Sequence, residues 1–139
     1  MIESKLDELT SKLNNAESLW ELVNKTVLIG VWDWHFDNGT LVWDNNMFKL
    51  FGVKNPGTSV DYDFFKNCLV PEDHSVVEQS IQDCIRNHTD YKYVFRLASR
   101  PGVSIYGNGK CFYDKDGKAY RMMGVNLEAP DACTSSHSL

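Results

Sequence analysis

The sequence lacks any run of basic residues, and its acidic side chains outnumber its basic ones. Its 139 residues carry 14 lysines and arginines against 19 aspartates and glutamates, so the formal net charge is -5. A protein that binds the phosphates of a nucleic acid needs clustered positive charge, and so does a segment that binds an anionic membrane. We therefore expect no nucleic-acid partner.

Long apolar runs are also missing. No segment reaches the roughly eighteen uninterrupted apolar residues that a membrane-spanning helix requires. The opening residues MIESKLDEL contain acids where a secretory signal peptide has a basic start followed by an apolar run. From these two absences we predict that the chain does not insert into a membrane. We expect it to be a cytoplasmic protein or the cytoplasmic part of a larger one.

The four cysteines are few and widely spaced. Cys68, Cys84, Cys111 and Cys133 form no C-x-x-C pair, and none has a histidine at metal-ligand spacing. We therefore predict no metal site. The first three lie within apolar patterns, where a free cysteine behaves as a small hydrophobic residue, so a structural role is favoured over redox sensing.

Signatures of catalysis are absent too. The chain has no G-x-S-x-G elbow, P-loop, H-E-x-x-H or kinase motif. Glu72 and Asp73 are adjacent carboxylates, but they stand at a predicted helix start, where acidic side chains favour the helix dipole. We expect no catalytic residues and no enzymatic activity.

What the chain does have, first, is a strong heptad pattern in residues 1–26. The apolar positions are separated alternately by four and three residues, which is the a/d seam of a coiled coil. They are Ile2, Leu6, Leu9, Leu13, Ala16, Trp20 and Val23, followed by Val27. We predict an amphipathic helix over about Ser4 to Val23 that pairs two copies in a homodimer through its early turns, while Leu19 to Val27 docks on the rest of the chain.

Three tryptophans follow within residues 29–44, IGVWDWHFDNGTLVWD. Asp37-Asn38-Gly39 is typical of a tight turn between two strands, so the stretch reads as a β-hairpin. Alternation along the first strand separates two faces. Trp32, Trp34 and Phe36 share one, and Val31, Asp33 and His35 share the other. Core packing and a ligand-stacking wall both remain open for the tryptophans.

The later elements indicate an α+β domain over residues 27–128. Asp44 is placed to cap a short helix that Gly52 ends, and a longer helix is predicted over Pro71 to Asn87. Strands are expected over about 91–97, 103–113 and 119–127. Strands in two clusters with helices between them predict an antiparallel sheet with helices on one face. Residues 129–139, rich in serine, are expected to form a flexible tail.

Several short motifs occur in one order along this domain. They are Gly30-Val31-Trp32-Asp33-Trp34, Trp43-Asp44, Leu50-Phe51-Gly52, Pro71-Glu72-Asp73, Arg96-Leu97, Gly109, Asp114-x-x-Gly117 and Arg121-x-x-Gly124. The ordered set resembles the PAS domain family, in its large bacterial sensory branch. The chain departs from that pattern at Val70, where the family usually has histidine, and at Asn126-Leu127-Glu128, where a closing Asp-Ile-Thr is common.

The resemblance implies a fold and a function. The fold is a five-stranded antiparallel sheet of order 2-1-5-4-3 whose helices enclose a ligand cavity. The function is a sensory, signal-transducing module that binds a small ligand or partner and couples it to dimerisation through the N-terminal helix, with a kinase or cyclase as effector. A ligand-free dimerisation platform is the alternative. Apolar positions on the enclosing elements are expected to line the cavity: Trp34, Trp43, Phe48, Phe51, Phe65, Phe95, Cys111 and Met123.

Some sequence features bear on two cofactors that the superfamily uses, flavin and haem. Asn67-Cys68 is similar to the Asn-Cys pair of the flavin-binding light-oxygen-voltage branch, but Leu69-Val70-Pro71 follows at once where that branch has Arg-Phe-Leu-Gln, so flavin is disfavoured. His74 and His88 flank the long predicted helix, a region from which some relatives take an axial haem ligand. Haem is thus a minor alternative, and the sequence requires no cofactor.

Overall fold

The computed structural model describes residues 2–129. Its elements, in chain order, are α1 (Ile2–Thr26), β1 (Gly30–His35), β2 (Leu41–Trp43), α2 (Asn45–Phe51), α3 (Tyr62–Asn67), α4 (Pro71–Asn87), β3 (Tyr91–Arg96), β4 (Ser104–Tyr113) and β5 (Ala119–Glu128). The predicted bounds of α4 are confirmed at both ends. The helix predicted over about Ser4 to Val23 is longer than expected by about a turn in total.

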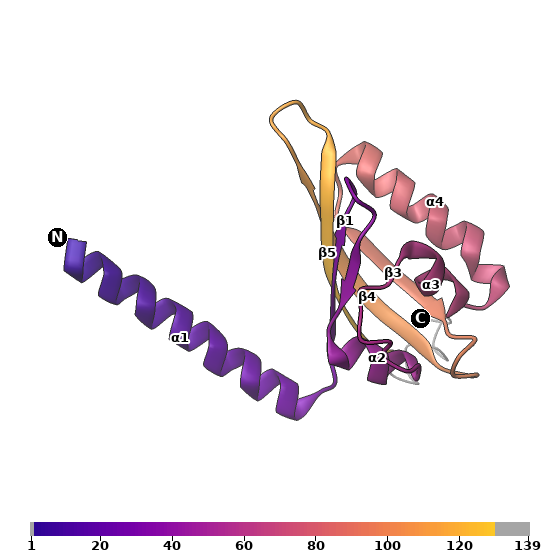
Figure 1. Ribbon diagram of the computed structural model, residues 1–139, viewed down its shortest axis with the longest axis horizontal. Helices are drawn as coiled ribbons and strands as arrows, with labels where there is room; N and C mark the ends of the chain where they lie inside the picture. Colours follow the sequence, from indigo (N-terminus) through magenta and orange to yellow (C-terminus); the bar gives the residue numbers. More distant parts are fainter. Residues whose placement is uncertain (1, 130–139) are drawn as a thin grey trace, which may run out of the picture.

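The five strands form one antiparallel sheet of order β2-β1-β5-β4-β3, as predicted. Helices α2, α3 and α4 lie on one side of this sheet, while α1 leaves the domain on the other side (Figure 1). Trp32 of β1 stands opposite Trp43 of β2 and Gly124 of β5. The first strand and the last strand are therefore neighbours at the middle of the sheet.

Local sequence explains where the short helices begin and end. The Asp44 carboxylate accepts hydrogen bonds from the backbone N–H groups of Met47 (2.9 Å) and Val31 (3.1 Å), which caps α2 and ties it to β1. Gly52 ends α2 with φ 68°, a left-handed conformation that favours glycine. The Asp61 carboxylate caps α3 by accepting from the backbone N–H of Phe64 at 2.8 Å.

Aromatic rings fill the core between the sheet and the covering helices. Phe51 is fully buried, and its ring centroid lies 4.7 Å from that of Trp43 and 5.9 Å from that of Phe95. Phe65 of α3 packs edge-on against Phe95 at 5.4 Å. Strand β3 alternates as predicted, with its three aromatic residues buried and the residues between them exposed.

Two ion pairs join elements that are distant in sequence. Arg121 of β5 donates two hydrogen bonds to Asp33 of β1, at 2.8 and 2.5 Å. Arg96 of β3 donates three to Asp73 of α4, from its backbone N–H at 2.8 Å and from its guanidinium at 3.2 and 2.7 Å. These hydrogen bonds hold the pKa of each carboxyl below its ordinary value, against the opposing effect of burial.

Helix α1 contrasts with the rest of the chain, because none of its residues is buried. It extends away from the sheet (Figure 1), and its side-chain hydrogen bond to the domain runs from Asn46 to Asn24 at 3.2 Å. The prediction that Leu19 to Val27 docks on the domain is therefore wrong: Leu19 is 62% exposed and Trp20 39% exposed. The core is closed by α2, α3 and α4 on the other side of the sheet, so α1 is not needed to cover it.

The domain ends one residue later than expected. Ala129 is buried, and its backbone N–H donates to the carbonyl of Ser104 at 2.8 Å. The rest of the predicted tail, 130–139, lies outside the described residues, as does Cys133. Cys68, Cys84 and Cys111 are free and buried, and no helix within residues 2–129 is long and apolar enough to cross a membrane.

Candidate functional site

A partly enclosed, apolar cavity of about 30 Å³ lies between the inner face of the sheet and the covering helices. Every element except α1 and β4 contributes to its wall. The lining residues are Trp32, Trp34, Leu41, Trp43, Met47, Tyr62, Phe65, Ile81, Tyr91, Met122 and Asn126. A space of this size accommodates one or two water molecules, so a larger guest requires its walls to move.

The indole of Trp32 lies flat on the floor of the cavity because glycines stand beneath it. A Cβ on Gly124 would overlap the Trp32 ring and lie 2.7 Å from the carbonyl oxygen of Asn108. A Cβ on Gly109 would meet the same ring at 3.0 Å. These two strand glycines are therefore needed for close approach of an aromatic ring to the sheet.

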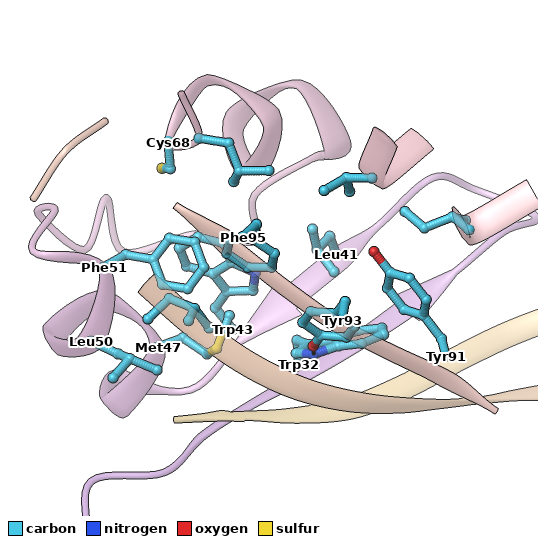
Figure 2. Close-up of a cluster of buried hydrophobic side chains, with 14 of the residues drawn as sticks. Trp32, Leu41, Trp43, Met47, Leu50, Phe51, Cys68, Tyr91, Tyr93 and Phe95 are labelled. Atoms are coloured by element: carbon cyan, nitrogen blue, oxygen red, sulfur yellow. Dashed lines mark hydrogen bonds between the residues drawn. The ribbon is translucent and has the colours of Figure 1, made fainter. Parts of the chain in front are cut away.

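A chain of buried polar groups crosses this floor. The indole N–H of Trp32 donates to the hydroxyl of Tyr93 at 3.1 Å, and that hydroxyl donates to the side-chain oxygen of Asn126. The Asn126 amide in turn donates to the sulfur of Met47 at 3.4 Å. Figure 2 shows the Tyr93 hydroxyl beside the Trp32 indole. Each member has a partner, so the chain fixes Trp32 and Asn126 in place.

Two further hydroxyls at the cavity have no such partner. The phenol oxygens of Tyr62 and Tyr91 are buried, and neither forms a hydrogen bond with any group in residues 2–129. Tyr91 is 4% exposed and projects from β3 toward the covering helices (Figure 2). A buried polar group without a partner costs about 1–3 kcal/mol, so these hydroxyls are the groups of the wall that a guest would satisfy.

The phenols around the cavity are neutral at physiological pH. Burial raises the pKa of Tyr62 to about 12, with further contributions from Glu78 and Asp63. Burial likewise raises the pKa values of Tyr91 and Tyr93 well above the ordinary tyrosine value. Each hydroxyl therefore keeps its proton and is available as a hydrogen-bond donor.

The structure divides the eight predicted cavity residues into three groups. Trp34, Trp43 and Phe65 line the cavity. Four others are buried in the core without lining it: Phe48, Phe51, Phe95 and Cys111. Met123 is misplaced, because Met122 is the residue of β5 that faces inward and lines the cavity, whereas Met123 lies on the outer face of the sheet with Val125.

Other lining residues were not predicted. Trp32 shares its strand face with Trp34, so the alternation that identified one tryptophan indicated the other as well. Tyr91 was recognised as part of a half-buried strand, and its place at the cavity depends on the packing of α3 and α4. Asn126 gave no sequence signal, since a polar residue in a strand is normally exposed.

The wall of the cavity consists of apolar and neutral polar side chains. No carboxylate, amine or imidazole lines the cavity, and residues 2–129 contain no group of three or more metal-ligating side chains. Cavity-lining side chains of this kind supply hydrogen bonds and apolar contacts, but no general base and no activated nucleophile.

The residues that the sequence offers for haem or flavin, His74, His88 and Cys68, do not line this cavity. The ring of His74 hydrogen-bonds the Leu69 carbonyl at 3.2 Å, and His88 stacks on Tyr113 with ring centroids 3.8 Å apart, so both histidines lie away from the cavity wall. The Cys68 thiol donates to the Phe64 carbonyl at 3.3 Å, and burial raises its pKa to about 11. That thiol neither lines the cavity nor has thiolate character.

Comparisons with known proteins agree with the fold. Among curated proteins, the probable diguanylate cyclase DgcE of Escherichia coli (strain K12) is 27% identical over 108 residues. Those residues are 77% of this chain but 10% of that protein, so the chain spans about a tenth of the length of the curated relative it matches.

Two solved structures show the same architecture. A sensory box histidine kinase/response regulator from Burkholderia thailandensis E264 superposes with a TM-score of 0.70 at 19% identity, covering 86% of this chain and 90% of that chain. The N-terminal domain of a diguanylate cyclase with PAS/PAC sensor from Marinobacter aquaeolei gives 0.63 at 16% identity, covering 72% and 94%. At these identities the likeness concerns the fold alone.

A family model supplies the assignment. The model described as the PAS fold matches residues 40–126, which is more than half of the chain and runs from the end of the first hairpin turn through most of β5. The sheet order β2-β1-β5-β4-β3, expected from the motif resemblance, is the order observed. The chain therefore belongs to the PAS-fold family.

Proposed function

We propose that this chain is a sensory signal-transduction module that works as a homodimer, with α1 joining two copies and relaying the state of the cavity to an effector. The observation that carries the proposal is the condition of α1. Its apolar seam repeats over about three heptads, yet none of its residues is buried within the chain. A helix in a protein gains most of its stability when its apolar face packs against another element. A second copy of α1 offers a complementary apolar face.

The outer face of the sheet supports the same assembly. Val42, Val94, Tyr106 and Val125 are exposed there, although they lie on strands whose other face forms the core. This face is on the side of the domain from which α1 leaves (Figure 1). A paired α1 would therefore run beside apolar sheet surface, through which a change in the domain can reach the helix.

The effector is proposed from the relative. DgcE is a probable diguanylate cyclase, and this chain matches about a tenth of it. We infer that the effector of this module is a cyclase or kinase domain, in the same protein or a partner, and that the module itself has no catalytic activity. Binding at the cavity changes pairing only if the guest has different affinities for two arrangements of the dimer.

A ligand-free dimerisation platform is the second candidate, and the small cavity favours it. A space of about 30 Å³ is close to a filled core. Native mass spectrometry of the purified protein beside a denatured control separates the two functions. A mass excess that denaturation removes indicates a bound ligand, and a dimer without excess mass indicates the platform.

The pairing itself is tested by sedimentation velocity on two matched double variants. Leu9→Asp with Leu13→Asp places charge on the seam. Ser11→Asp with Asn14→Asp adds the same charge on the opposite face of α1, where both residues are exposed. We expect the wild type and the control to be dimeric, and the seam variant to lose at least about a hundredfold in association constant, since burial of each leucine is lost.

The fluorescence and chemical-shift dispersion of the domain should be unchanged in both variants, because α1 is not part of its core. A seam variant that stays dimeric at the wild-type association constant contradicts the proposal that α1 joins the two copies.

A further inference from the structure

We propose that the cavity selects a small, uncharged molecule with a carbonyl oxygen, held by the hydroxyls of Tyr62 and Tyr91 while the rest of the molecule contacts Leu41, Ile81 and Met122. The inference rests on the proposed sensory function and names the chemistry of its ligand. The observations that lead to it are two buried, unpartnered hydroxyls on tyrosines that line one partly enclosed apolar cavity.

The rings that carry these hydroxyls are fixed by stacking. Tyr62 of α3 lies nearly parallel to Trp34, with ring centroids 5.3 Å apart and planes 9° apart. Tyr91 of β3 stacks on Tyr93, with centroids 4.3 Å apart, and Tyr93 is itself held by Trp32 and Asn126. The two tyrosines therefore line the cavity from separate elements, with rings in orientations that a guest does not have to organise.

The two unpartnered hydroxyls require a hydrogen-bond acceptor on the guest. Both hydroxyls remain protonated, and a carbonyl oxygen has two lone pairs, so one carbonyl is able to accept from both donors. The wall supplies no charged side chain to balance an ionic guest, and burial of an unpaired charge is strongly unfavourable. An uncharged ketone, aldehyde, ester or amide meets both conditions.

The guest must be small, and the wall must yield at one place to admit it. Helix α3, which carries Tyr62, has six residues and none of them is fully buried. The other walls come from the sheet and from α2 and α4, which carry buried side chains. Outward movement of α3 is therefore the least costly way to enlarge the cavity, and it moves one of the two donors with the guest.

The test uses two probes of similar shape, cyclopentanone and methylenecyclopentane. Cyclopentanone has a carbonyl oxygen where methylenecyclopentane has a methylene group. Binding is followed by the indole N–H signals in two-dimensional NMR. Trp34 and Trp43 line the cavity and report on it, while Trp20 on α1 is an internal control for non-specific solvent effects.

We expect cyclopentanone to shift the Trp34 and Trp43 signals with saturation, to leave Trp20 unchanged, and to bind about tenfold more tightly than methylenecyclopentane. The double variant Tyr62→Phe with Tyr91→Phe keeps both rings and should abolish that preference. Tyr106→Phe with Tyr120→Phe, at two exposed tyrosines, should retain it.

Three results would overturn the inference. They are equal binding of the two probes, an unchanged preference in the Tyr62/Tyr91 variant, and the absence of shifts with either probe, which would mean that the cavity holds water at most. The proposed function is judged separately. Loss of ketone selectivity in a chain that still pairs through α1 rejects the ligand chemistry alone, whereas a seam variant that stays dimeric rejects the pairing whatever the probes do.

Discussion

Helix α1 and the domain of residues 30–129 differ in the exposure of their apolar residues. Both have regular apolar periodicity, with a heptad in α1 and alternation in the strands. In the domain the apolar residues form a core, in which Phe51, Ile105 and Met122 are fully buried. In α1 they are not buried, with Leu9 52% and Leu13 60% exposed.

Their ion pairs differ in the same way. The pair in α1 joins Glu8 to Lys12 within one helix, at 3.3 Å and with both side chains largely exposed. The domain has one pair of this kind, Asp83 with Arg86 in α4, but it also pairs Asp73 with Arg96 and Asp33 with Arg121 across elements. Contacts within one element support local structure, whereas contacts between elements support a tertiary fold. The difference indicates that α1 makes little tertiary contact within residues 2–129, and the predictions below test that view from the largest effect to the smallest.

The largest expected effect is a truncation in the core. Phe51→Ala should lower the free energy of unfolding of the domain by about 3–5 kcal/mol, because it leaves a cavity beside Trp43 and Phe95. Leu13→Ala removes an apolar side chain from α1 and should change the same quantity by less than about 0.5 kcal/mol. Urea denaturation at a protein concentration below the dissociation constant of the proposed dimer, followed by tryptophan fluorescence, measures both without a contribution from pairing.

Similar losses in these two variants would contradict the contrast between the regions. They would mean that α1 packs on the domain in solution.

A middle-sized effect is expected at the floor of the cavity. A Cβ on Gly107 would overlap the Asn126 side chain and the Tyr93 ring. Gly107→Ala should therefore cost about 1–3 kcal/mol through overpacking, measured by thermal unfolding. Asn108→Ala, at the next residue on the exposed face of the same strand, is the control and should lie within about 0.5 kcal/mol of the wild type. A harmless Gly107→Ala would show that the polar chain beneath Trp32 is loosely packed.

Acid should weaken the domain through its inter-element ion pairs. The pKa of Asp73 is lowered in the folded protein by hydrogen bonds from Arg96, so the stabilisation is fully present above the unfolded carboxyl pKa. It is lost progressively as pH falls from about 4, the ordinary aspartate value, through the lower folded pKa. Urea midpoints at pH 7 and pH 3 should therefore differ less in Asp73→Asn than in the wild type.

Glu72→Gln, at the exposed neighbouring carboxylate, is the control for the acid effect and should keep the wild-type difference. An Asp73→Asn chain with the full wild-type pH dependence would show that the Asp73–Arg96 pair adds little to the fold.

Local signals predicted much of the secondary structure, since they act within a few residues. Pro71 at the first position of α4 and the carboxylates after it fix the start of that helix, and Asp44 and Gly52 bound α2. The hairpin turn and the alternation of β3 are local in the same sense. The sheet order followed from the ordered motifs, whose resemblance to a known family carries information that no single residue holds.

The cavity was predicted less well, because its wall depends on contacts between distant segments. Met122 and Met123 are both apolar and adjacent, and which of them faces inward is set by pairing with β1, where Trp34 stands opposite Met122. Tyr62 and Tyr91 come from elements on different sides of the cavity. Their missing hydrogen bonds become visible only when α3 and β3 are packed together.

The sequence by itself determined the helices, the turns, which residues of the first strand share a face, and the heptad seam, because backbone preferences and side-chain periodicity act over short distances. Only the tertiary structure decided that Trp32 and Trp34 face the covering helices, that α1 stays apart from the core, and that two tyrosine hydroxyls are left without partners. Those features depend on which surfaces pack together, and the free energy of packing depends on both surfaces of a pair.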